Sequence, residues 1–209
     1  MTSATPGDSE GCILCHVPVE VRLATVDRVP RIAAMMGRAF VAEPFMLWAF
    51  GDHGDLAARF GRFFESLDAS FVESGMLWEA GDSLGAAVWI PPGGPHGADH
   101  ARVRTIDELA ANPDRCSKFW EWVGSKTADE PMWVLDHVGV DPGHQGGGIG
   151  SALVELGLAR ARENGVAAYL EAGNPRNVPY YERLGFKVVE EADAPDGGPH
   201  VWFMRCDPP

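Results

Sequence analysis

Positive charge is scarce in this chain. Lys and Arg together number 17 against 30 Asp and Glu, which leaves a net charge of −13. Nucleic acids and anionic membranes are bound through basic patches, so we expect neither as a partner. The negative balance instead favours a cationic ligand.

Long apolar stretches are also missing. The sequence holds no run of about 18 apolar residues, the length that a membrane-spanning helix needs. Its first residues, MTSATPGDSE, have neither the basic nor the apolar region of a secretory signal. We therefore expect a cytoplasmic protein, with residues 1–18 as a flexible N-terminal tail and residues 19–209 as a single domain.

Cysteine is rare as well, with four residues in the chain. So few cysteines do not make a disulfide scaffold at this length. Cys12, Cys15 and His16 spell the pattern of c-type haem attachment, but no export signal precedes them, and zinc would need further ligands. We expect no haem and no metal site, and the role of these three residues stays open.

One glycine-rich segment carries the strongest signal, residues 138–152, which read VGVDPGHQGGGIGSA. An apolar strand turns there through glycines into a helix, whose first backbone N–H groups are free to hold an anion. A P-loop is excluded because Gly150 is followed by Ser151 and Ala152, where a P-loop has Lys and then Ser or Thr. A dinucleotide fingerprint is excluded because no glycine register fits Gly-x-Gly-x-x-Gly. The segment predicts a cradle for a diphosphate.

The hydrophobic pattern predicts strands and helices in alternation. Strands are expected at residues 20–24, 76–80, 86–90, 133–140, 167–170, 187–190 and 201–204. Helices are expected after a cap at Asp27, at 56–72, within 105–124, at 149–164 with Gly165 closing it, and at 177–184, with loops at 43–54 and 91–97. This order predicts an α/β fold in which helices flank a mixed sheet.

Two segments together resemble the GNAT superfamily of N-acetyltransferases. Gln145-x-x-Gly148-x-Gly150 matches the family's acyl-CoA loop, and a second tract, NVPYYERLGF at residues 177–186, follows at the family's spacing. The resemblance implies a mixed, mostly antiparallel sheet that splays between its fourth and fifth strands. It also implies an acetyl-CoA-dependent enzyme, monomeric or homodimeric, that acetylates the primary amine of a small molecule such as an antibiotic or aminonucleoside.

The resemblance assigns the cofactor-binding residues. The main chain of Val138, Gly139 and Val140 is expected to pair with the amides of the pantetheine arm, as an added strand would. Asn177 is expected to meet the same arm and to cap its helix. The diphosphate is expected on Gln145, Gly146, Gly147, Gly148, Ile149, Gly150 and Ser151.

Two residues are expected to carry the chemistry. Tyr181 matches the family tyrosine near the thioester sulfur, and a phenol with a pKa of about 10 keeps its proton at neutral pH, as a general acid requires. The acceptor amine must lose a proton, and we favour Glu171 at the end of its strand as the base. Asp136, His137 or a water chain remain alternatives. Direct attack on the thioester is favoured, because neither Cys116 nor Cys206 lies in a motif that lowers a thiol pKa.

Acceptor specificity is expected from the loop after the first helix. Its aromatic faces and negative charges suit an aromatic, cationic amine, and they belong to Glu43, Phe45, Trp48, Phe50 and Asp52. Two other functions stay open at this point. One is acetylation of protein lysines or N-termini, which would use an open peptide groove, and the other is non-catalytic sensing of acyl-CoA.

Overall fold

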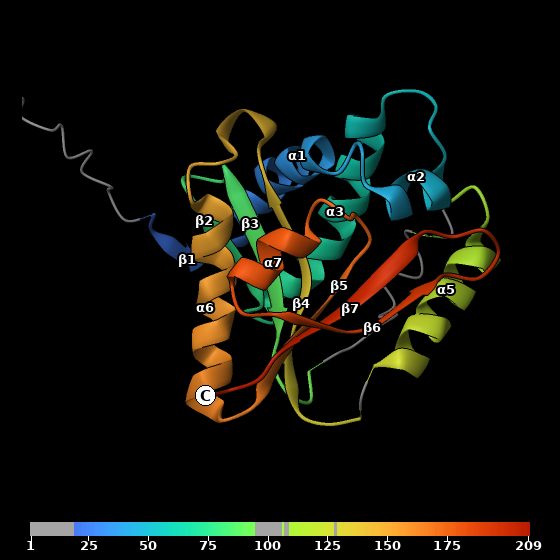
Figure 1. The fold of residues 1–209 in the computed structure, drawn as a ribbon. Coiled ribbons are helices and arrows are strands. Elements are labelled where there is room, and N and C mark those ends of the chain that lie inside the picture. Colours follow the sequence, from blue (N-terminus) through green and yellow to red (C-terminus); the bar gives the residue numbers. More distant parts are fainter. Residues whose placement is uncertain (1–18, 95–105, 107–108, 128) are drawn as a thin grey trace, which may run out of the picture.

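Figure 1 shows the fold in a computed structural model, which describes residues 19–94, 106, 109–127 and 129–209. Cys12, Cys15, His16 and part of the expected loop at 91–97 lie outside the described residues. The described strands form one seven-stranded sheet in the order β1-β2-β3-β4-β5-β7-β6. They are β1 (Val21–Leu23), β2 (Leu77–Ala80), β3 (Gly85–Ile90), β4 (Met132–Val140), β5 (Ala167–Ala172), β6 (Lys187–Asp193) and β7 (His200–Cys206). Every neighbouring pair is antiparallel except β4 and β5, which confirms the predicted mixed, mostly antiparallel sheet.

Helices cover both faces of this sheet (Figure 1). They are α1 (Val29–Ala39), α2 (Pro44–Phe50), α3 (Leu56–Glu73), α5 (Pro113–Lys126), α6 (Ile149–Asn164) and α7 (Val178–Arg183), with short 3-10 turns at Val26–Arg28 and Pro142–His144. One core cluster joins α1, α3 and α5 to the sheet face that carries Val88 and Phe203. A second cluster joins α6 and α7 to the opposite face, which carries Trp89 and Leu170. Because side chains alternate along a strand, each central strand contributes to both cores.

Strands β4 and β5 separate toward their carboxyl ends. They pair in parallel from Met132 with Ala167 as far as Leu135 with Leu170. Beyond that point β4 continues to Val140 with no pairing to β5 in the described residues. The predicted splay between the fourth and fifth strands is therefore confirmed, and the facing main-chain edges are left open to a ligand.

A β-bulge interrupts β4 beside this opening. Val88 of β3 pairs with His137, whereas the next residue, Trp89, pairs with Leu135, so Asp136 is the extra residue of β4. The bulge breaks the alternation of side chains, and the side chains of Asp136 and His137 meet in a hydrogen bond. Bulges often re-aim side chains next to active sites.

Helix α6 begins and ends where the sequence predicts. Gly148 at its start and Gly165 at its end have φ values of 87° and 66°, in the left-handed region that glycine tolerates. The helix packs very closely on the sheet, because a Cβ on Gly157 would lie 2.0 Å from Cε2 of Trp89. The indole N–H of Trp89 donates to the carbonyl oxygen of Leu153 at 3.1 Å. These contacts fix the helix, and with it the glycine loop, against the sheet.

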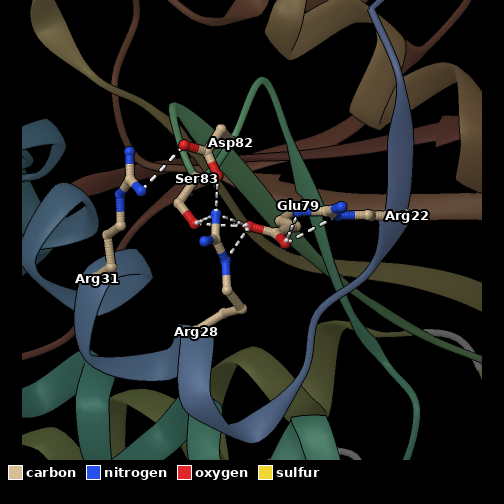
Figure 2. Close-up of polar contacts among 6 residues, drawn as sticks. All are labelled: Arg22, Arg28, Arg31, Glu79, Asp82 and Ser83. Atoms are coloured by element: carbon tan, nitrogen blue, oxygen red, sulfur yellow. Dashed lines mark hydrogen bonds and ion pairs between the residues drawn. The ribbon is translucent and has the colours of Figure 1, made fainter.

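An ion-pair network joins the first strand to the β2–β3 hairpin (Figure 2). Glu79 on β2 is 1% exposed, and its carboxylate accepts hydrogen bonds from Arg22, Arg28 and Ser83. Arg28 also pairs with Asp82 at the hairpin turn. Burial alone would raise the pKa of Glu79, but the hydrogen bonds from Ser83, Arg28 and Arg22 outweigh it and lower the pKa. A buried carboxylate is thus satisfied, and it anchors β1 and the start of α1.

Two local predictions in the N-terminal third of the chain are wrong. Asp27 does not cap the first helix, because it lies inside a 3-10 turn and Arg28 takes the N-cap position of α1. Residues 44–50, predicted as loop, form α2, in which Met46 and Phe50 are buried in the core. A segment this short has little helical stability of its own, so its conformation depends on tertiary packing.

No single helix in the described part of the chain is long and apolar enough to cross a membrane. Val26–Ala39 and α2 meet the length and composition criteria only as a pair that is bent by 98° at the break between them. The apolar side chains of α1 are buried against the sheet. The described residues also contain no group of three or more His, Cys, Asp and Glu that could hold a metal ion.

Candidate active site

A cavity of about 570 Å³ lies between the end of β4, the glycine loop and α7. It is lined by every residue expected to bind the cofactor except Gly147, namely Val138, Gly139, Val140, Gln145, Gly146, Gly148, Ile149, Gly150, Ser151 and Asn177. His144, Tyr180, Tyr181, Arg183 and Leu184 complete the lining. The structure therefore brings the predicted residues together. The predicted cap by Asn177 is wrong, because its side chain makes no capping hydrogen bond to α7.

The glycine loop carries backbone amides suited to an anion. Gly148, with its left-handed φ, turns the chain into α6 without the clash that a Cβ would bring. The first intrahelical hydrogen bond of α6 runs from the amide of Ala152 to the carbonyl of Gly148, at 3.0 Å. The amides of Ile149, Gly150 and Ser151 precede it and lie at the positive end of the helix dipole. Such amides bind phosphate groups.

Neighbouring contacts hold the start of this loop in place. Asp141, directly after β4, accepts a hydrogen bond from the amide of Gly143 at 3.0 Å, and its Oδ2 lies 2.6 Å from Nη2 of Arg38 on α1. The hydrogen bond from Arg38 is the main cause that lowers the pKa of Asp141 to about 2. Gln145 folds back and donates from Nε2 to the carbonyl of Val140 at 3.3 Å. The loop is thus tied to β4 and to α1.

A second cavity, of about 400 Å³, fills the opening between β4 and β5. It adjoins the first, since both are lined by Val138, Gly139, Val140, Gln145, Asn177 and Tyr181. Tyr181 is 8% exposed, and burial raises the pKa of its phenol above the usual value, with smaller contributions from Tyr180 and Glu43. The phenol therefore stays protonated at neutral pH, as a general acid must.

Glu43 reaches the same opening from the other side of the sheet. It occupies the N-cap position of α2, but its side chain makes no capping bond there. Its Oε1 lies 2.9 Å from the position that a Cβ would take on Gly173, and Asn174 lines the same cavity. Burial raises the pKa of Glu43 from 4.5 to about 7, against the lowering effect of Asn174. A carboxyl group that titrates near neutral pH is suited to general base catalysis.

The predicted base, Glu171, and its alternative Asp136 both lie at the opening between β4 and β5. Both line this cavity and two neighbouring ones of about 130 and 840 Å³. His137 is 8% exposed, and its ring nitrogens hydrogen-bond with Asp136 at 2.8 Å and with Asp68 of α3 at 2.9 Å. Because both ring nitrogens are occupied, His137 has no free position for a substrate proton.

The cavity of about 130 Å³ is mainly apolar and aromatic. Its apolar lining comes from α1, α2, α3, α5 and β7 and consists of Phe40, Phe45, Met46, Phe63, Phe64, Leu67, Phe119, Trp120, Val123 and Val201, together with Pro199. Of the expected acceptor loop, Glu43 and Phe45 line this cavity, whereas Trp48, Phe50 and Asp52 do not. Phe50 is instead buried in the core, and the Trp48 ring lies 4.2 Å from the guanidinium carbon of Arg115.

Two site residues were missed by sequence reasoning. Arg183 lines the cofactor cavity and adds a positive charge beside the loop amides, and its place in the NVPYYERLGF tract was the available signal. Glu43 was expected only in the acceptor wall. No local pattern indicates that it packs against Gly173 and Asn174, which follow β5.

Comparisons with known proteins agree with this geometry. Residues 67–186, more than half of the chain, match the model of the acetyltransferase (GNAT) family. The chain is 45% identical to mycothiol acetyltransferase of Propionibacterium freudenreichii, an alignment that covers 82% of this chain and 67% of the relative. It is 31% identical to mycothiol acetyltransferase of Actinosynnema mirum, with 86% and 73% covered.

A solved structure supports the same assignment. The crystal structure of histone acetyltransferase HPA2 and related acetyltransferase from Corynebacterium glutamicum superimposes with a TM-score of 0.67 at 28% sequence identity. The superposition covers 92% of this chain and 98% of that one. The chain therefore belongs to the acetyltransferase (GNAT) family.

Proposed function

We propose that this acyltransferase moves the acetyl group of acetyl-CoA directly onto the primary amine of a small molecule. The observation that carries the proposal is that the two cavities adjoin and that Tyr181 lines both of them. The loop amides are suited to the diphosphate, the open edge of β4 to the pantetheine amides, and the opening between the strands to the thioester. The acceptor would approach from the side of Glu43, Asp136 and Glu171.

The chemistry needs a proton acceptor and a proton donor. Glu43 takes a proton from the acceptor ammonium, and the neutral nitrogen then attacks the carbonyl carbon of the thioester. The C–N bond forms and the C–S bond breaks while Tyr181 protonates the departing thiolate. Tyr181 regains a proton from the attacking nitrogen, which becomes a neutral amide, and Glu43 releases its proton to solvent.

We assign the base to Glu43 ahead of Glu171 for two reasons. The pKa of Glu43 is raised to about 7, so the group exchanges protons near neutral pH. Glu43 also lines the same cavity as Tyr181, and its charge contributes to the raised pKa of that phenol. Glu171 remains the second candidate, since it lines the same cavity.

A route through a cysteine has less support than direct attack. Burial raises the pKa of the Cys116 thiol to about 11 and also raises that of Cys206. A nucleophilic cysteine needs its thiolate form, which these environments disfavour.

The lining of the acceptor side favours a cationic amine with an apolar or aromatic body. The 45% identity to the Propionibacterium relative favours a second candidate, namely the acceptor of mycothiol acetyltransferase. Aminonucleoside antibiotics form a third class, because residues 21–25 and both motif segments resemble puromycin N-acetyltransferase. Cytoplasmic location and a monomeric or homodimeric state stay predictions.

An assay of thiol release from acetyl-CoA tests the proposal across aminonucleosides, aminoglycosides, polyamines, arylalkylamines, the acceptor of mycothiol acetyltransferase and peptides. We expect turnover with at least one class of small amine. Turnover with peptides alone would identify a protein acetyltransferase instead. Binding of acetyl-CoA without turnover of any amine would indicate a sensor module.

A further inference from the structure

His137 lies between two carboxylates in the interior of the protein. Its Nδ1 is 2.8 Å from Oδ1 of Asp136, and its Nε2 is 2.9 Å from Oδ1 of Asp68. Asp68 is fully buried on α3, and the rings of Phe64 and Phe71 lie 5.2 and 6.1 Å from the imidazole, centroid to centroid. Apolar rings and two hydrogen bonds thus fix the plane of the imidazole.

The charge of His137 follows from this environment. Burial alone would lower the pKa of His137, but Asp68 and Asp136 together outweigh it and raise the pKa to about 9. The two carboxylates thus favour the imidazolium, while burial raises the pKa of Asp68. An ion cluster of this kind is weak evidence for stability, because desolvation cancels most of its attraction, and apolar residues of similar volume often serve a core as well.

The exposed end of this chain of contacts is Asp136. As the extra residue of the bulge, it lines all three cavities on the acceptor side, whereas His137 lines two of them and Asp68 lines none. In a protonated His137, Nδ1–H donates to Asp136 and Nε2–H donates to Asp68, so both carboxylates fix the ring. The Asp136 carboxylate is therefore held by the His137 ring, which the buried Asp68 fixes in turn.

We propose that Asp68 and His137 are positioning residues that hold the Asp136 carboxylate on the acceptor side, where Asp136 binds the ammonium group of the acceptor. This inference rests on the proposed function, since it supplies the acceptor with a binding group. Asp136 orients the ammonium, and Glu43 then takes its proton. The two carboxylates thereby divide binding and catalysis between them.

Calorimetry with two probes of equal shape tests this role without turnover. Phenethylamine carries an ammonium at neutral pH, and 2-phenylethanol is its neutral counterpart. We expect the folded protein to prefer the amine by about tenfold or more, as one charged hydrogen bond in a partly buried site allows. Asp136→Asn should abolish the preference, and Asp68→Asn should reduce it by about threefold or more. Affinity for coenzyme A should stay unchanged in both variants.

Each result decides a different question. The inference would be overturned if the wild type did not prefer phenethylamine over 2-phenylethanol. It would also be overturned if Asp136→Asn kept this preference, or if Asp68→Asn showed the same preference as the wild type. If the wild type did not bind coenzyme A, the proposed function would be wrong. The comparison of the two probes would still test whether Asp136 binds an ammonium group.

Nuclear magnetic resonance of labelled imidazole supplies a second measurement that needs no variant. The charged groups that face His137 are Asp68 on α3 and Asp136 on β4, with Glu43 and Glu171 across the shared cavity. We expect His137 to carry both ring protons at pH 8, well above the ordinary histidine pKa of about 6.5. A ring without a proton on Nδ1 at that pH would overturn the positioning role, because Asp136 would then receive no hydrogen bond from it.

Discussion

Oε1 of Glu43 lies 2.9 Å from the place that a Cβ would occupy on Gly173, so this carboxylate fills the space left by a missing side chain. Glu43 stands at the start of α2, and Gly173 directly follows β5. The contact brings the proposed base to the opening between β4 and β5, which Tyr181 also lines.

Gly173→Ala should displace the Glu43 carboxylate while the fold survives. The new methyl group would meet the end of a flexible side chain, which can move away. We expect kcat to fall by about tenfold or more because the base loses its position, with little change in the melting temperature. Steady-state kinetics and thermal unfolding measure the two effects. When Gly173→Ala is combined with Glu43→Gln, kcat should fall no further than in Glu43→Gln alone. Additive losses of kcat would show that Gly173→Ala does not act through Glu43.

The pH profile should report the raised pKa of Glu43. The base must be deprotonated, so kcat/KM should rise as the pH increases through about 7, and Glu43→Gln should lose this limb. The raised pKa of Glu43 also makes the stability of the protein depend on pH. Because this pKa is about 7 in the folded protein, above the ordinary value of 4.5, protonated Glu43 stabilises the fold, and this contribution is lost as the pH rises through about 7. Glu43→Gln should therefore raise the melting temperature at pH 8. If the rise of kcat/KM persists in Glu43→Gln and disappears in Glu171→Gln, the general base is Glu171.

Tyr181→Phe should lower kcat by about a hundredfold and leave the affinity for coenzyme A unchanged, since general acid catalysis contributes on that scale. Tyr169→Phe is the matched control. It removes the same hydroxyl from a buried ring in the other core cluster, and we expect kcat close to that of the wild type. Equal losses of kcat and cofactor affinity in Tyr181→Phe would indicate a packing role.

Gly157→Ala should destabilise the protein by about 3 kcal/mol, because the new Cβ would meet the Trp89 ring and overpack a tight contact. Gly124→Ala provides the control on α5, where an added Cβ meets nothing within 4 Å. That change should stabilise the protein by up to about 1 kcal/mol through helix propensity. Urea unfolding measures the free energy of unfolding of both variants. Similar values for Gly157→Ala and Gly124→Ala would contradict the close approach of α6 to the sheet.

Helix α6 and the cofactor loop could be predicted because their determinants are local. Gly148 and Gly165 mark the helix ends, and the residues that line the cofactor cavity fall in two short segments, 138–151 and 177–184. The helix at 44–50 and the bulge at Asp136 could not be predicted in this way. Both depend on packing against distant segments, and a one-residue bulge leaves no trace in a hydrophobic pattern. The approach of Glu43 to Gly173 is likewise set by how α2 and β5 meet.

Calorimetric titration with acetyl-CoA tests the central claim that the loop amides hold the cofactor's diphosphate. We predict that the wild type binds one molecule per chain. Ser151→Asp should weaken binding by about a hundredfold, because the new carboxylate repels the diphosphate. The same negative charge is favourable for the stability of α6, since it lies at the helix N-terminus. The exposed Ser117→Asp on α5 should bind as the wild type does. No binding by the folded wild type, or unchanged affinity in Ser151→Asp, would contradict the claim.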